Sequence, residues 1–194
     1  DIHAMNMLYG TDPLFIFDPD NKDNRPLAGY QENALIFWDL YPQRLRDLFT
    51  TSFTVGLAQP NRRITEGKWM ETFANLMSGI MRCPNCGSEV FYDVQKEEKG
   101  VAHTCWGCQN AVTVPPKIVI GKSAVLLMSN TKLYRHHIEG NYDMETIVGE
   151  VVQNPENPKL WGMKNLSGDN WTYSKADGTQ IPVPQGRSAA IVKD

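Results

Sequence analysis

Long apolar runs, abundant cysteine and a strong charge of either sign are all missing from this chain of 194 residues. No run approaches the roughly 20 apolar residues of a membrane helix, so no membrane span is predicted. The net charge of −3 gives no general attraction to nucleic acid or to an anionic membrane. The phosphate-binding patterns G-x-x-x-x-G-K-[ST] and G-x-G-x-x-G and the nucleophile elbow G-x-S-x-G are absent. The chemistry therefore has to be sought elsewhere.

Only four cysteines occur, in two C-x-x-C pairs with eighteen residues between the pairs. They are Cys83 with Cys86 and Cys105 with Cys108. This spacing is typical of a four-thiolate zinc site. Four ligands fill a tetrahedral shell and leave no position for a substrate water, so we expect a structural Zn²⁺ and not a catalytic one.

Two other readings of the cysteines are weaker. Two disulfides would need an oxidising setting, and the chain opens without a charged-then-apolar leader. A redox motif needs one C-x-x-C pair beside a βαβ pattern, not two pairs. His103 precedes Cys105 by two residues, but four thiolates already saturate a metal, so we expect His103 beside the site or on the surface.

Composition along the chain predicts an α+β protein of three modules. Residues 1–80 carry helical patterns, residues 81–115 hold the cysteines as a zinc ribbon, and residues 116–194 form an antiparallel β-sandwich. The ribbon is too small to be stabilised by apolar burial alone, so the metal is expected to supply much of its stability. Because the numbered chain starts at Asp1 without Met, we expect it to be part of a longer protein.

Two helices are predicted in the first module. Apolar residues recur at helical spacing in residues 43–53, and Gly56 and Pro60 are expected to end that helix. Thr65 is expected to cap a second helix, and the two helices are expected to pack as a hairpin. The apolar face of the second helix is Trp69, Phe73, Leu76, Met77 and Ile80.

Short β-rich runs dominate the rest of the chain. Residues 91–94 and 111–114 are predicted strands of the ribbon. Asp177-Gly178 predicts a hairpin turn. His136 and His137 are expected to point to opposite faces of a strand, so that they do not share a metal. The predicted strands of the third module cover residues 118–120, 124–128, 132–134, 147–152, 161–166, 171–173 and 189–192.

Nucleic-acid binding by the ribbon is disfavoured by its charge. Residues 81–115 carry three basic and four acidic side chains, a net charge of −1. Binding to phosphates needs a basic face. We therefore expect the ribbon to be a scaffold or a protein contact.

The helical module resembles the end of a protein-kinase C-lobe. Residues 45–49 lead to Gln59-Pro60-Asn61-Arg62-Arg63-Ile64-Thr65 and then to Trp69, similar to the D-P-x-x-R-x-T-like stretch before the last kinase helix. The resemblance implies structural roles for Arg63 and Trp69, with Arg63 pairing with a buried glutamate. Residues 13–19, 24–26, Trp38 and Tyr41-Pro42 resemble bacterial kinase-like proteins that are encoded in stress or tellurium-resistance systems.

The β-rich tail is similar to a forkhead-associated, phosphothreonine-binding sandwich. Residues 161–167, 177–179 and 184–186 carry the resemblance, and residues 134–137 resemble the Ser-Arg-x-x-His recognition loop of that family. The resemblance implies a phosphate or partner contact made by Arg135, His137, Asn165 and Ser167.

No catalytic residue is predicted, because the glycine-rich loop, strand lysine, H-R-D-x-x-x-x-N loop and D-F-G motif of kinases are absent. The expected function is that of a non-catalytic regulatory and docking segment of a bacterial protein-kinase-like protein. Its expected partners are the kinase body or another protein, including a phosphothreonine peptide, in the cytoplasm. The alternative is a free-standing zinc-ribbon adaptor that binds protein or nucleic acid.

Overall fold

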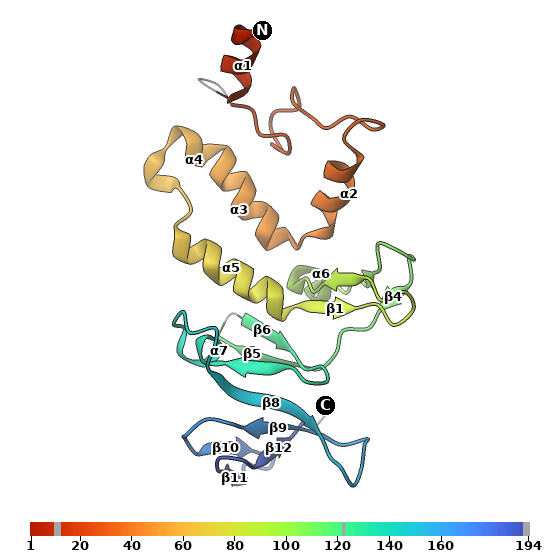
Figure 1. The fold of residues 1–194 in the computed structure, drawn as a ribbon, viewed down its shortest axis with the longest axis vertical. Coiled ribbons are helices and arrows are strands. Elements are labelled where there is room, and N and C mark those ends of the chain that lie inside the picture. The colour runs from red at the N-terminus through yellow and green to blue at the C-terminus, as the bar shows by residue number, and fades with distance from the viewer. Residues whose placement is uncertain (10–12, 122, 192–194) are drawn as a thin grey trace. The chain divides into compact units, whose positions relative to one another are not determined.

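The computed structural model of the protein describes residues 1–9, 13–121 and 123–191. The chain divides into two compact units, residues 1–113 and residues 114–194. The cysteines share the first unit with the longer helices, and the second unit is mainly antiparallel strands (Figure 1). No described helix combines the length and the apolar character needed to cross a bilayer. The mixed α and antiparallel-β composition confirms the coarse fold class, whereas the three-module division stays a prediction.

The first unit begins with a series of helices. They are α1 (Ile2–Tyr9), α2 (Glu32–Leu40), α3 (Gln43–Phe53), α4 (Val55–Ala58), the 3₁₀ turn η1 (Pro60–Arg62) and α5 (Glu66–Ser78). The two predicted helices are α3 and α5, and they contact each other. Thr65 caps α5 as predicted, because its side chain accepts a hydrogen bond from the Lys68 N–H. Gly56 does not terminate the helical region, since it lies inside α4.

An aromatic cluster packs the helices together. Trp69 on α5 meets Phe49 on α3 edge-on, with 5.0 Å between ring centroids. Trp38 on α2 stacks on Phe17, with centroids 4.3 Å apart. These geometries are favourable for aromatic pairs. Trp69 therefore packs α5 against α3, while the role that the kinase resemblance implies for it stays a prediction. The full cluster consists of Phe15, Phe17, Trp38, Phe49, Phe53, Trp69 and Phe73.

Two small hairpins carry the cysteine pairs. Strand β1 (Ile80–Arg82) pairs antiparallel with β2 (Glu89–Phe91), and β3 (His103–Thr104) pairs with β4 (Ala111–Val112). The short helix α6 (Val94–Glu98) lies between the hairpins in sequence. The predicted strand over residues 91–94 is therefore displaced, since the observed strand covers residues 89–91 and only Phe91 is common to both. The Asp93 side chain accepts the Gln95 N–H and starts a helix there.

The second unit contains one four-stranded sheet and two hairpins. Its elements are β5 (Lys117–Ile120), β6 (Ser123–Leu126), β7 (Lys132–Tyr134), α7 (Arg135–Glu139), β8 (Ile147–Gln153), β9 (Trp161–Asn165), β10 (Trp171–Ser174), β11 (Gln180–Val183) and β12 (Ser188–Ala190). The sheet has the order β12-β9-β8-β7, while β5 pairs with β6 and β10 pairs with β11. All these pairings are antiparallel. That this sheet and the two hairpins form a forkhead-associated-like β-sandwich stays a prediction.

Three local predictions in the second unit are refined. The Asp177-Gly178 turn does join two strands, and the second of them, β11, was not predicted from its sequence. The predicted strand over residues 189–192 corresponds to β12, which begins at Ser188 and ends at Ala190, before Ile191; Val192 lies outside the described residues. His136 and His137 lie on helix α7 and not on a strand, and their rings meet with centroids 3.9 Å apart.

The core of the second unit lies against one face of the sheet. Its buried members are Val125, Leu127, Leu133, Val148, Val151 and Met163. Trp171 on β10 packs against this cluster beside Gly149 on β8. A Cβ atom at Gly149 would lie 2.8 Å from the Trp171 ring. The glycine therefore creates the space in which the β10–β11 hairpin packs on the sheet.

We predict that Gly149→Ala lowers the free energy of unfolding of the second unit by about 1–3 kcal/mol, because the indole must shift. Gly168→Ala is the matched control, since a Cβ at Gly168 meets nothing within 4 Å. Urea titration followed by tryptophan fluorescence measures both variants. Equal midpoints for the two would contradict the packing of Trp171 over β8.

Candidate functional site

The four cysteine sulfurs converge in the first unit. All four Sγ atoms lie within 4.8 Å of one another. Cys83 Sγ is 3.6 Å from Cys108 Sγ, and Cys86 Sγ is 3.5 Å from Cys105 Sγ. Tetrahedral zinc with Zn–S bonds of about 2.3 Å requires sulfur separations of about 3.8 Å. A disulfide would need about 2.05 Å. The residues therefore form a cluster that can hold a metal ion and is compatible with zinc.

Each cysteine pair sits in a turn with the same hydrogen bonds. The Cys83 N–H donates to the Ser88 carbonyl at 2.9 Å, and the Gly87 N–H donates to the Cys83 carbonyl at 2.9 Å. These bonds bend the chain so that both thiols of a pair point to one side of the hairpin tip. The second turn repeats them at 2.9 and 2.8 Å with Cys105, Asn110 and Gln109.

The fifth residue of each turn adopts a left-handed conformation. Gly87 has φ of +77°, and Gln109 at the equivalent position has φ of +62°. Glycine suits such a position at no steric cost, whereas a side chain there is strained. Gln109 is held in place because its side-chain amide donates to the Trp106 carbonyl at 3.0 Å. The two turns thus have the same backbone geometry, and each presents two thiols to the cluster.

The two turns also bind each other. The Trp106 indole N–H donates to the Glu89 carbonyl on β2 at 3.0 Å. A Cβ at Gly107 would lie 2.8 Å from Ser88 Oγ, so a larger residue at this position would require the Ser88 hydroxyl to rotate away. Sequence reasoning did not single out Trp106 or Gly107, although both lie between Cys105 and Cys108.

Polar groups around the sulfurs favour thiolate at two of the four. The Ser88 hydroxyl, 3.3 Å from Cys86 Sγ, lowers the pKa of that thiol. The Asn110 backbone amide lowers the pKa of Cys108 to about 6. Burial raises the pKa of the Cys105 thiol to about 11. A bound cation would offset the cost of deprotonating the buried Cys105 thiol, because metal ligation replaces the proton on each sulfur.

Asp93 attaches the cysteine hairpins to the helices. Its carboxylate is buried and accepts the Gln43 N–H at 3.1 Å, at the first turn of α3. Pro42, which precedes α3, provides no side-chain cap. Asp93 therefore caps α3 from 50 residues away, which no local pattern in the sequence reveals.

His103 supports the same junction and does not approach the sulfurs as a ligand. It is buried, and its Nε2 accepts the Asp93 N–H at 2.9 Å. Burial lowers its pKa. Of the two expected placements, the surface one is wrong, because the His103 imidazole is buried and accepts a hydrogen bond inside the first unit.

Arg63 contacts the neighbouring helix. Its Nε donates to the Gly56 carbonyl at 3.0 Å, which ties the segment before α5 to α4. This contact fits a structural role. The pairing with a buried glutamate that the kinase resemblance implies stays a prediction.

The four residues predicted to contact a partner lie near one end of the sheet in the second unit. The Arg135 N–H donates to the Thr146 carbonyl, and the Leu166 N–H donates to the Val148 carbonyl. The start of β8 is thus flanked by the segment after β7 and the segment after β9. With strands about 4.8 Å apart, these two segments are separated by about 10 Å. The sheet therefore brings Arg135 and Ser167 to the same end.

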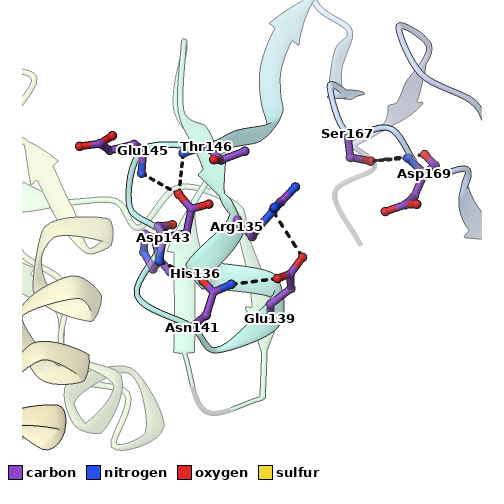
Figure 2. Close-up of polar contacts among 9 residues, drawn as sticks. All are labelled: Arg135, His136, Glu139, Asn141, Asp143, Glu145, Thr146, Ser167 and Asp169. Carbon is purple, nitrogen blue, oxygen red and sulfur yellow. Dashed lines mark hydrogen bonds and ion pairs between the residues drawn. The ribbon is translucent and has the colours of Figure 1, made fainter.

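Of these residues, Arg135 is the exposed cation. Its Nε lies 3.4 Å from Glu139 Oε1, and both side chains are about half exposed. Figure 2 shows this pair beside the loop in which Asp143 accepts the N–H groups of Glu145 and Thr146. An exposed ion pair of this length is weak and can be exchanged for another anion.

The side chains of Asn165 and His137 make hydrogen bonds to backbone groups of the neighbouring loops. Asn165 is fully buried, its Nδ2 donates to the carbonyls of Asp169 and Val183, and its Oδ1 accepts from Ser167. His137 Nδ1 accepts the Tyr134 N–H at 2.9 Å at the start of α7. A fully buried amide does not reach a ligand on the surface, so Asn165 positions the loop that carries Ser167. Within that loop the Asp169 N–H donates to the Ser167 hydroxyl at 3.3 Å (Figure 2).

Comparison with known proteins yields no relative: no family model, no curated protein and no solved structure matches the chain. The assignment of function therefore depends on the geometry of these two sites.

We predict that Cys86→Ser abolishes stoichiometric metal binding and lowers the melting temperature of the first unit, because the core of the hairpins is too small to stabilise them without a metal. Elemental analysis and thermal melting measure this. Ser88→Ala is the control: it keeps all four thiols and loses only a hydrogen bond, so metal is retained. Unchanged metal content and melting in Cys86→Ser would contradict the site.

We predict that acid destabilises the second unit through His137. Burial, and then the charge of His136, lower its pKa to about 4. Because the folded pKa lies below the unfolded value of about 6.5, this contribution to stability is complete above pH 6.5 and is lost as pH falls toward 4.

His137→Gln tests this pH dependence, because glutamine at the same helical position accepts the Tyr134 N–H without titrating. Denaturant titrations of the variant from pH 7 to pH 4 should show a smaller loss of stability than the wild type. His3→Gln, at an exposed position on α1 in the first unit, is the control and should keep the wild-type slope. A wild-type slope in His137→Gln would refute the assignment.

Proposed function

We propose that this chain is a non-catalytic docking segment of a bacterial protein-kinase-like protein. In this proposal a structural zinc ion holds the first unit together, and the second unit recognises a phosphothreonine peptide of a protein partner. The observation that carries it is the sheet end where exposed Arg135 and the ordered Ser167 loop flank the start of β8.

Zinc is the metal that the donor set favours. Four thiolates in a tetrahedral arrangement suit Zn²⁺, and hard cations such as Ca²⁺ or Mg²⁺ prefer oxygen ligands. The four sulfurs complete the coordination shell, so the proposed role is structural. The ion would hold the two hairpins together. The hydrogen bond from the Gln43 N–H to Asp93 would in turn keep the start of α3 against them.

Arg135 is the proposed phosphate ligand. A guanidinium donates two parallel hydrogen bonds to a phosphate, a stronger interaction than its exposed pair with Glu139. Ser167 is less suited to donate to phosphate, because its hydroxyl already donates to Asn165 Oδ1 at 2.7 Å. The proposed role of its loop is to contact the peptide backbone, with Asn165 and His137 positioning the two segments.

We predict that the chain binds phosphothreonine peptides more tightly than their unphosphorylated forms. Arg135→Ala should weaken binding at least about tenfold, since a hydrogen bond to a charged group contributes about 1.5–3 kcal/mol. Glu139→Gln should strengthen it, because the guanidinium is released. Screening a phosphothreonine peptide library and then measuring fluorescence anisotropy at fixed salt tests both.

Lys159→Ala is the matched control, because Lys159 is an exposed cation in the β8–β9 connection, at the other end of these strands. Equal loss in Lys159→Ala and Arg135→Ala would indicate non-specific charge attraction and contradict the site. Salt-sensitive binding to DNA or RNA, with no peptide preference, would instead favour the zinc-ribbon adaptor.

A further inference from the structure

A large apolar groove lies within the second unit. Its volume is about 790 Å³, within the range of ligand sites and far above the voids of a packed core. The sheet contributes Leu133 and Met163, and the hairpins contribute Ile118 and Trp171. The groove is formed by β5, β10 and β12 together, so its wall includes the edge strand of the sheet.

The edge strand β12 presents unused backbone groups. In the described part of the chain its only strand partner is β9. The Asn165 N–H donates to the Arg187 carbonyl, and the Ile191 N–H donates to the Trp161 carbonyl. In an antiparallel ladder, alternate residues face the partner strand. The N–H and C=O groups of Ser188 and Ala190 therefore point away from β9, where they form a template for another strand.

Strand addition at β12 would also fill the groove. Ala189 pairs with Met163, and both residues line the groove. A residue placed opposite Ala189 on an added strand lies on the same face of the sheet, so its side chain would enter the groove. Side chains two positions away on the added strand would point into the groove as well, because alternate residues of a strand share one face. Apolar residues at alternate positions are what this lining accommodates.

The charge of the groove lining indicates that the partner segment is acidic. Two lysines, Lys117 and Lys175, contribute to the groove lining, and none of its lining residues is acidic. The chain as a whole is acidic, with a net charge of −3, so this local excess of positive charge is distinctive. An acidic residue at the end of the added strand would complement it.

We propose that the groove beside β12 is a docking site for an extended segment of a partner protein, which joins the four-stranded sheet as a further strand. The segment carries apolar side chains at alternate positions and an acidic residue near Lys175. This mode of recognition combines backbone hydrogen bonds for affinity with side-chain pockets for specificity. It uses residues other than the Arg135 end of the sheet and stands independently of phosphopeptide binding.

The test uses a labelled heptapeptide, acetyl-Glu-Val-Thr-Val-Ser-Val-Glu-amide, and the full chain. Saturable binding by fluorescence anisotropy is expected. The same peptide N-methylated at alternate residues on its pairing edge keeps its side chains but loses strand pairing, so its affinity should fall at least about tenfold. Absence of binding, or equal affinity for both peptides, overturns the proposal.

Two protein variants locate the site. Ala190→Pro removes an outward N–H while leaving the bonds between β12 and β9, and it should weaken peptide binding about tenfold. Lys175→Glu should weaken binding of the Glu-flanked peptide and strengthen that of a Lys-flanked version. Lys159→Glu is the control, because Lys159 is exposed and does not line the groove. Unaltered binding in both test variants overturns the assignment to this groove.

The oligomeric state is measured on the same samples. Sedimentation should give a monomer whose mass rises by one peptide on saturation. A dimer that dissociates in Ala190→Pro would identify a second copy of the chain as the occupant and overturn the proposal of a separate partner. Thermal melting confirms that Ala190→Pro is folded, and the N-methylated peptide tests strand pairing without any variant.

Discussion

Convergence of four thiols on one point is the constraint on which the first unit depends. The hairpins β1–β2 and β3–β4 are two or three residues long per strand, and their buried apolar strand residues are Met81, Val90 and Val112. Hairpins of that size are marginal in water on their own. A metal held by both turns would join chain segments about twenty residues apart in sequence and add to the stability of this small core. The repeated hydrogen bonds of the turns, and Gly107 between them, are the local devices that make this convergence possible.

Asp93 connects the cysteine hairpins to the helices. A single buried carboxylate starts α6 and caps α3, while His103 accepts its backbone N–H. Unpaired N–H groups at a helix start are costly to bury, so the position of α3 depends on the cysteine hairpins being formed. Loss of metal is therefore expected to affect more than the ribbon. Through this coupling, the cysteine hairpins help to hold α3 in position.

The second unit carries the two proposed recognition sites on one small sheet. Its end, at the start of β8, combines an exposed arginine with loops held by Asn165 and His137. Its edge, at β12, combines free backbone groups with an apolar groove. Side chains provide the proposed phosphate contact in the first case, and backbone provides the proposed contact in the second. In both proposals a nearby cation helps to select an acidic partner, and it stands out because the chain is acidic overall.

How far the sequence could be read depended on the range of the interactions. The spacing of Cys83, Cys86, Cys105 and Cys108 determined the metal cluster, and periodicity with the Thr65 cap determined α3 and α5, because these signals are local. Helix α7 was missed since it is only five residues long, too short for a periodic pattern. The cap from Asp93 to Gln43, the packing of Trp171 over Gly149 and the open edge of β12 required the tertiary structure. Each joins residues whose proximity arises only when strands and helices pack, and no local pattern encodes that.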